Sequence, residues 1–351
     1  MKSIFRPRLC GVVFGCVAAA LGTSVLHASD QGHESGVDQA SDEDVSVLVQ
    51  GIGQDRLFAI DFEGSMGIAV GGAGMVKISQ DGGSNWVSEQ APTTLALFGV
   101  SLAKGRAIAV GQQGLVLLRD EQGAWREVQS VTRERLLDVD MNAQGLAVAV
   151  GAFGTVIASR DGGQSWSNAA PDWIEIAKVA GRQNDRTGAV NEPTVFAVQT
   201  FDDGSVLLGG ELSYILRSTN AASTWSLAYR APVLNDVVAP TVHAIEVRPD
   251  GVGFAVGQEG HVFKTTDRGV SWVVRPTPSG NGNLLAVSST GTGRVFAVGM
   301  RIAMRSDNDG DSWAVVHGGD FAVNWYSDIA SSTQERQLIG AGHSGRIIAI
   351  N

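Results

Sequence analysis

Short apolar runs recur along the chain from about residue 45 onward, separated by polar segments rich in glycine, serine and aspartate. Some runs alternate apolar and polar positions and others are continuous, and both patterns are typical of strands buried between neighbouring sheets. The runs resemble one another, as in "LFAIDF" at 57–62, "LFGVSL" at 97–102 and "VFAVQT" at 195–200. The pattern therefore predicts an all-β protein made of many short strands.

A longer unit repeats with a period near 40 residues, as in "AVGGAGMVKISQDGGSNW" at 69–86 and "AVGAFGTVIASRDGGQSW" at 149–166. Each unit holds an apolar first run, a second that ends in Ala-Val-Gly or a variant of it, a third after a glycine-rich turn, and a fourth that starts at a tryptophan. There are seven units, and the last stops before its tryptophan. This period predicts a seven-bladed β-propeller of four-stranded blades, covering residues 44–351.

The seventh unit lacks its fourth strand, whereas one strand-like stretch, "DVSVLVQ" at 44–50, precedes the first unit. We expect this N-terminal strand to pair with "RIIAI" at 346–350 and to close the ring. Such pairing leaves no open sheet edge in the last blade.

The phrase "SRDGGQSW" at 159–166 recurs as "SQDGGSNW" at 79–86 and "TTDRGVSW" at 265–272. Glycine supplies positive φ in a tight hairpin, and an aspartate can accept hydrogen bonds from the backbone N–H groups of the loop. The tryptophan ring is large enough to fill the space between two sheets. The residues assigned this structural role are Asp81, Trp86, Asp161, Trp166, Asp267, Trp272 and Trp313.

The pattern Ser/Thr-x-Asp-x-Gly-x-x-Trp resembles the Asp-box, or bacterial neuraminidase (BNR), repeat. Together with the "AVGxxGxV" run, it makes residues 45–351 similar to the photosystem II stability/assembly factor family of seven-bladed propellers. That resemblance implies a non-catalytic scaffold that helps a membrane protein complex to assemble or function. Other Asp-box propellers bind carbohydrates or small ligands, including sialidase-like glycosidases, and this alternative stays open.

Propellers usually bind on loops that lead into the innermost strands and on turns between second and third strands, so side chains there are the first candidates for recognition. The alternative is a solvated rim without a ligand. The candidate partner-binding residues on this face are Arg56, Arg133, Arg135, His243, Arg301 and Trp325, and the neighbouring loop and turn positions include Gln112, Phe153, Glu192, Glu211, Glu259 and His343.

Residues 167–194 interrupt the even period, and "DWIEIAKVAG" within them predicts a short amphipathic helix or an added strand. Insertions on a rigid scaffold often carry partner contacts, so Trp173 is a further candidate for partner binding. The competing interpretation is a lid that packs on its own protein.

The N-terminal segment 1–28 has basic residues followed by an apolar run and ends in "SVLHA", which predicts a secretory signal peptide. A membrane anchor or a lipoprotein cysteine at Cys16 are the alternatives. Residues 29–43 are polar and acidic, which predicts a disordered leader. We therefore expect a protein exported across the inner membrane to the periplasm, peripheral to a membrane at most, and monomeric.

Both cysteines, Cys10 and Cys16, lie in the predicted signal peptide, so the exported chain would have no disulfide. The net charge of −10 becomes −13 without that segment, because its charged side chains are three basic ones. Such a charge disfavours nucleic acid as a partner. The histidines lack metal-ligand spacing, and no catalytic motif or cofactor fingerprint is present, so we expect no enzyme activity, metal or cofactor.

The sialidase-like alternative requires a tyrosine nucleophile, and the Arg-Ile-Pro motif that usually opens sialidases is absent. Of the three tyrosines, Tyr214 and Tyr229 fall in predicted third and fourth strands. Tyr326 is expected to be able to reach the channel.

Overall fold

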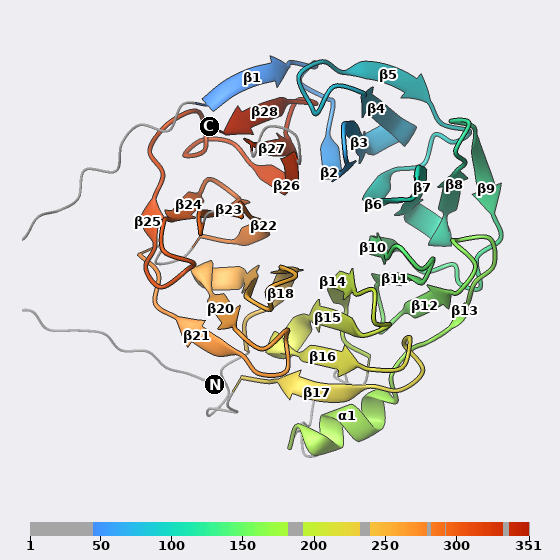
Figure 1. Cartoon of the computed structure of the whole chain (residues 1–351), viewed down its shortest axis with the longest axis vertical. Coiled ribbons are helices and arrows are strands. Elements are labelled where there is room, and N and C mark those ends of the chain that lie inside the picture. The colour runs from blue at the N-terminus through green and yellow to red at the C-terminus, as the bar shows by residue number, and fades with distance from the viewer. Residues whose placement is uncertain are drawn as a thin grey trace, which may run out of the picture. The chain divides into compact units, whose positions relative to one another are not determined.

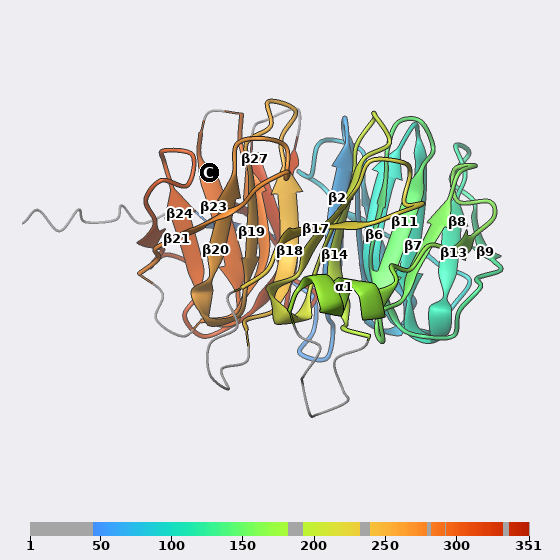
Figure 2. The ribbon, with the colours of Figure 1, turned by 90° about the horizontal axis from the view of Figure 1, so that it is seen from below.

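The computed structural model describes residues 45–181, 192–231, 239–278, 282–291, 293–332 and 337–350. Within these residues the chain forms seven four-stranded antiparallel sheets arranged as blades around a central channel (Figure 1). The sheets stand side by side around the ring with their strands running roughly along its axis (Figure 2). The predicted seven-bladed β-propeller is confirmed. The predicted signal peptide 1–28 and leader 29–43 lie outside the described residues.

In every blade the strands run in chain order from the channel outward, apart from the last blade, which takes its outer strand from the N-terminal end. Blade 1 contains β2 (Leu57–Glu63), β3 (Met66–Gly71), β4 (Met75–Ser79) and β5 (Val87–Gln90); blade 2 contains β6 (Leu97–Ala103), β7 (Arg106–Gly111), β8 (Val116–Arg119) and β9 (Trp125–Val128); blade 3 contains β10 (Leu136–Met141), β11 (Ala147–Gly151), β12 (Val156–Ser159) and β13 (Ser167–Asn168). Blade 4 contains β14 (Val195–Thr200), β15 (Val206–Gly210), β16 (Ile215–Ser218) and β17 (Ser226–Tyr229); blade 5 contains β18 (Val242–Val247), β19 (Gly253–Gly257), β20 (Val262–Thr265) and β21 (Val273–Arg275). Blade 6 contains β22 (Leu284–Ser289), β23 (Val295–Gly299), β24 (Ala303–Ser306) and β25 (Ala314–Val315); blade 7 contains β26 (Tyr326–Ser332), β27 (Gln337–Gly342), β28 (Ile347–Ile350) and β1 (Val45–Val49).

The N-terminal strand closes the ring as predicted. β1 pairs antiparallel with β28, with Val45 opposite Ile350 and Val47 opposite Ile348. Leu48 and Val49 pack against the apolar cluster between blades 7 and 1. The two ends of the propeller are therefore joined by backbone hydrogen bonds and by apolar packing.

Each pair of neighbouring blades shares one cluster of buried apolar side chains. The repeat tryptophans lie in these clusters, between their own blade and the preceding one. Trp166 of blade 3 packs among side chains of blades 2 and 3, and its Nε1 donates to the carbonyl of Gly163 at 3.1 Å. Blade 7 has no such tryptophan, and Phe321 and Tyr326 fill the equivalent junction with blade 6, with Val45 packed against them.

The glycine turns show the contacts expected from their side chains. Ser159 Oγ donates to Asp161 Oδ1 at 2.7 Å and accepts from the Gly163 N–H at 2.9 Å. Partial burial opposes ionisation of Asp161, but hydrogen bonds from Ser165 and Ser159 prevail and lower its pKa to about 2. The aspartate thus fixes the turn through acceptor oxygens.

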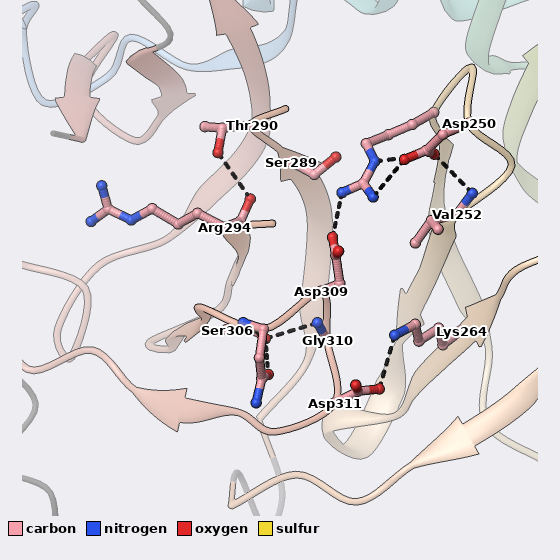
Figure 3. Close-up of polar contacts among 12 residues, drawn as sticks. Asp250, Val252, Lys264, Ser289, Thr290, Arg294, Ser306, Asp309, Gly310 and Asp311 are labelled. Atoms are coloured by element: carbon pink, nitrogen blue, oxygen red, sulfur yellow. Dashed lines mark hydrogen bonds and ion pairs between the residues drawn. The ribbon is translucent and has the colours of Figure 1, made fainter. Parts of the chain in front are cut away.

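Blade 6 keeps the same turn with an amide in place of the carboxylate, because Asn308 Oδ1 accepts from the Ser312 N–H at 2.9 Å. Figure 3 shows this turn, where Ser306 accepts from the N–H of Gly310. The same turn is tied to blade 5, since Arg248 donates to Asp309 at 2.6 Å and Lys264 to Asp311 at 2.9 Å. These ion pairs supplement the apolar packing of the two blades.

The insertion after blade 3 contains α1 (Trp173–Val179), which lies outside β17 (Figure 1). Asp172 caps it by accepting from the Glu175 N–H at 3.0 Å. Trp173 and Ile176 are buried in the cluster between blades 3 and 4, and the Trp173 Nε1 donates to the carbonyl of Gly154 at 3.0 Å. The helix therefore packs on its own propeller, as the lid interpretation predicted. Among the described residues, no helix has the length and apolar character needed to cross a bilayer.

The closure by β1 can be tested with paired substitutions. Leu48 packs between blades 7 and 1, whereas Val47 is 51% exposed in the same strand. We expect Leu48→Ser to lower the free energy of unfolding by about 2 kcal/mol and Tm by about 5 °C. Val47→Ser should change Tm little, and deleting residues 44–50 should lower it by about 10 °C or more. Thermal unfolding followed by circular dichroism measures this, and an unchanged Tm in the deletion would contradict the closure.

Candidate functional site at the channel mouth

The innermost strand of every blade carries a β-bulge at its first residues. The register shifts between Leu57 and Ala59 in blade 1, and the other six blades show the same shift at the same place. A bulge bends the strand and re-aims the extra side chain. The residues in the seven bulges all line the channel: Phe58, Phe98, Leu137, Phe196, His243, Leu285 and Ser327.

The channel is a cavity of about 570 Å³ lined by the inner strands. Because the bulges lie where these strands begin, their side chains form a collar at one mouth. Three residues further along the same strands, polar and acidic side chains such as Asp61 and Asp140 line the interior, about 10 Å deeper. The channel thus has an aromatic mouth and an acidic interior.

Aromatic and basic side chains form a continuous arc across one side of the mouth. Phe58 stacks on Trp325 with ring centroids 6.2 Å apart and contacts Phe98 at 5.3 Å. The Arg135 guanidinium lies over the Phe98 ring at 5.7 Å, a cation–π geometry. At the other end of the arc, Trp325 meets the His343 ring edge-on at 6.3 Å. Blades 3, 2, 1 and 7 therefore contribute to one surface, in which Phe58, Phe98 and Trp325 are half-buried.

Across the channel, His243 meets the Phe196 ring edge-on at 5.3 Å. Its Nδ1–H donates to the carbonyl of Leu284 at 2.8 Å. Burial lowers the pKa of His243 despite this hydrogen bond, which favours the neutral imidazole. The Nε2 atom is then the acceptor of the ring.

A partly buried hydrogen-bond network holds the His343 end of the arc. Asp320 accepts from His343 Nε2 at 3.0 Å, from Tyr326 Oη at 2.7 Å and from Arg346. Burial works against ionisation of Asp320, but the hydrogen bonds of Tyr326 and Asn324 and the charge of Arg346 keep its pKa below the usual value. The network fixes the ring of His343 beside Trp325.

The candidates named from the sequence are not all brought together. Three of them lie at the mouth: Arg135, His243 and Trp325. Arg56 forms a backbone bridge to His343. Its guanidinium donates to the carbonyls of Gly53 and Asp55.

Other candidates lie elsewhere. Arg133 and Arg301 are exposed, and neither lines the channel. Trp173 is only 8% exposed and packs in the cluster between blades 3 and 4. The turn residue Phe153 borders an outer groove instead of the channel. Tyr326, expected to be able to reach the channel, is 0% exposed between blades 6 and 7, so that expectation was wrong.

Sequence reasoning missed the bulge residues Phe58, Phe98 and Phe196 and the carboxylates of the channel. The signal was present, because in the first six units the second residue of the first apolar run is the one that reaches the mouth. Without the bulge, however, strand alternation gives no reason to separate this position from its neighbours.

The carboxylates in the channel serve the backbone of the next blade. The inner edge of each sheet faces the channel, so some of its N–H groups have no strand to pair with. Side chains of the preceding blade accept from them: Asp328 from Ile60 (2.8 Å), Asp61 from Leu102 (2.7 Å), Ser101 from Met141 (3.0 Å), Asp138 from Val198 (2.9 Å), Asp140 from Thr200 (2.6 Å), Gln199 from Val247 (2.7 Å) and Glu246 from Ser289 (3.1 Å). Among the described residues, this relay crosses six of the seven blade junctions.

Burial raises the pKa of these carboxyl groups, and the hydrogen bonds from backbone N–H groups offset only part of the effect. The pKa rises to about 7 for Asp61, Glu246 and Asp328 and to about 8 for Asp138. The charges of Asp328 and Asp140 raise the pKa of Asp138 further. Each group keeps some area open to the channel, so water solvates it in part. Within the described part of the chain, no three His, Cys, Asp or Glu side chains are grouped to hold a metal ion.

Comparisons with solved structures agree on the fold. A structure of YCF48 bound to D1 peptide matches with a TM-score of 0.64 and 14% identity over 89% of this chain and 96% of that one. YCF48 from Cyanidioschyzon merolae matches with a TM-score of 0.68 and 17% identity over 88% and 98%. The fold is shared.

A GH74 xyloglucanase from Xanthomonas campestris also matches, with a TM-score of 0.64 and 15% identity over 88% of this chain and 54% of that one. No family model and no curated protein sequence matches the chain. At these identities the likenesses show the propeller fold and leave function to be argued from the site.

The raised pKa values predict a pH dependence of stability. A carboxyl group whose pKa is higher in the folded than in the unfolded protein contributes stability below pH 4 that is lost as the pH rises through 7 to 8. Asp138→Asn cannot ionise, so the free energy of unfolding should change less between pH 5 and pH 8 than in the wild type, by about 1–2 kcal/mol.

Urea unfolding at both pH values measures this difference. The histidines with lowered pKa act with the opposite sign in the same window, but they are common to both proteins and cancel in the comparison. Equal pH dependence in wild type and variant would show that Asp138 is ionised in the fold at pH 5.

Proposed function

We propose that this protein is a non-catalytic scaffold that binds a segment of another protein at the mouth of its central channel. The observation that carries the proposal is the arc of Arg135, Phe98, Phe58, Trp325 and His343. Aromatic and arginine side chains contribute most of the binding energy at protein interfaces. Here Phe58, Phe98 and Trp325 are half-buried and Arg135 is exposed. Such a surface suits a short peptide segment that enters a concave mouth.

The partner we propose is a component of a membrane protein complex or another envelope protein. A structural relative, YCF48, has been solved bound to D1 peptide, which gives one precedent for a peptide on this fold. The proposed signal peptide 1–28 would deliver the protein to the periplasm, where such complexes are accessible. The acidic net charge makes a segment with basic residues a better partner than an acidic one.

The channel carboxylates support a structural role more than a catalytic one. Asp138 and Asp328 each accept one N–H from their own strand and one from the next blade, so both oxygens of each group are engaged. Tyr326, the tyrosine expected to reach the channel, is buried and donates to Asp320.

Carbohydrate binding, with or without hydrolysis, is the second candidate function. Phe58 and Trp325 would suit stacking on a sugar, carboxyl groups with raised pKa suit general acids, and a xyloglucanase is among the structural relatives. A glycan array with a panel of fluorogenic glycosides separates the two candidates. Robust binding or turnover would replace the scaffold proposal.

The proposal predicts which substitutions abolish partner capture. Affinity purification from the native envelope, followed by mass spectrometry, should recover the same membrane or envelope protein with wild type and lose it about tenfold or more with Phe98→Ala or Trp325→Ala. Val273→Ala, at a 58% exposed position on the outer strand β21, is the matched control and should leave recovery unchanged. Circular dichroism confirms folding of each variant. Equal recovery by all four proteins would contradict a site at the channel mouth.

A further inference from the structure

The turns between second and third strands share an unusual backbone conformation. One residue at the same position of each turn has positive φ, and none of the seven is glycine: Ala73, Gln113, Phe153, Leu212, Glu259, Arg301 and Ser344, with φ from 52° to 63°. Side chains strain the backbone in this region, whereas glycine does not. The turns therefore carry side chains at a position where glycine would fold more easily.

Phe153 is the least expected of these residues. A bulky side chain at positive φ is rare, and this ring is also 68% exposed to water. Leu212 in the next blade has the same backbone conformation, but its side chain packs against the cluster between blades 3 and 4. Strained and exposed positions of this kind concentrate at binding sites. Packing within this protein does not account for the ring of Phe153.

Phe153 borders a groove of about 580 Å³ between its turn and the start of α1. Two other exposed apolar side chains line it, Val131 at 55% and Ile174 at 70% exposure. The buried Trp173 also lines the groove, and its Nε1 donates to the carbonyl of Gly154, which ties the helix to the turn. The walls of the groove are therefore formed before any partner arrives.

The charges among the described lining residues of the groove are all of one sign. Asp172 and Glu192 line it and are exposed, and no lysine or arginine is among its described lining residues. Within the described residues, neither carboxylate forms an ion pair; Asp172 accepts only the capping N–H of Glu175. An apolar groove edged by two carboxylates complements a segment that is apolar and basic.

We propose that this groove docks a short peptide segment of a partner protein, in which an aliphatic or aromatic side chain stands next to a lysine or arginine. The apolar side chain packs between Phe153, Val131 and Ile174, and the basic group faces Asp172 and Glu192. The site is separate from the channel mouth and does not depend on the function proposed there. The acidic edge opposes adsorption of the same surface to an anionic membrane.

Peptide display tests the proposal. A random peptide library is selected on the purified full exported chain and counter-selected on its Phe153→Gly variant. Selected peptides should carry an apolar residue next to a basic one. Fluorescent copies should bind Phe153→Gly at least tenfold more weakly than wild type, although this change relieves backbone strain and should leave Tm equal or higher. Glu192→Gln should weaken binding about threefold and reduce its sensitivity to salt.

Ala73→Gly is the matched control, because it makes the same backbone change at the equivalent turn of blade 1 and should leave affinity unchanged. Trp325→Ala should also bind the peptides normally, which keeps failure here distinct from failure at the channel mouth. The proposal is overturned if no selected peptide distinguishes wild type from Phe153→Gly, or if the selected peptides are acidic. It is also overturned if Ala73→Gly loses as much peptide affinity as Phe153→Gly. Phe153-dependent binding to phosphatidylglycerol vesicles would overturn it as well, since the surface would then be a membrane contact.

Discussion

The innermost strand of each blade has backbone N–H groups that no neighbouring strand can pair with. The acceptors that these groups require determine which side chains line the channel. The innermost strand of each sheet has one edge open to the channel. A buried backbone N–H group without an acceptor on that edge costs folding free energy. The chain meets this constraint with side chains from the preceding blade, such as Asp61 for Leu102 and Asp138 for Val198. The two contacts join residues that are 41 and 60 positions apart in the chain and belong to neighbouring blades. They therefore also fix the position of one blade relative to the next.

That use of carboxylates shapes the chemistry of the channel. Burial raises the pKa of the channel carboxyl groups. In an enzyme, a carboxyl group with a raised pKa is a candidate general acid. Here the oxygens of Asp138 and Asp328 are engaged by the backbone. We therefore propose a structural role for the interior, with recognition at the mouth, where Phe58 and Trp325 lie, and at the turn that carries Phe153.

Sequence reasoning succeeded where the determining interactions are local or repeated. The turn contacts of Asp161 join residues within four positions, and the strand count follows from a repeated pattern of apolar runs. The pairing of β1 with β28 is long-range, yet counting strands made it predictable, since the seventh unit lacked one and the N-terminal segment had one to spare. The insertion was recognised, but the choice between lid and partner contact required knowing what Trp173 packs against.

The sequence by itself determined the propeller, its seven blades, its closure and the residues of its turns, because these depend on alternation, on turn chemistry and on the period of the repeat. Only the tertiary structure decided which side chains line the channel, that Tyr326 and Trp173 are buried, and that Phe153 stands strained beside a groove. The physical reason is that bulges and blade-to-blade contacts set where a side chain points and what surrounds it. Those surroundings come from a neighbouring blade some 40 to 60 residues away in the chain.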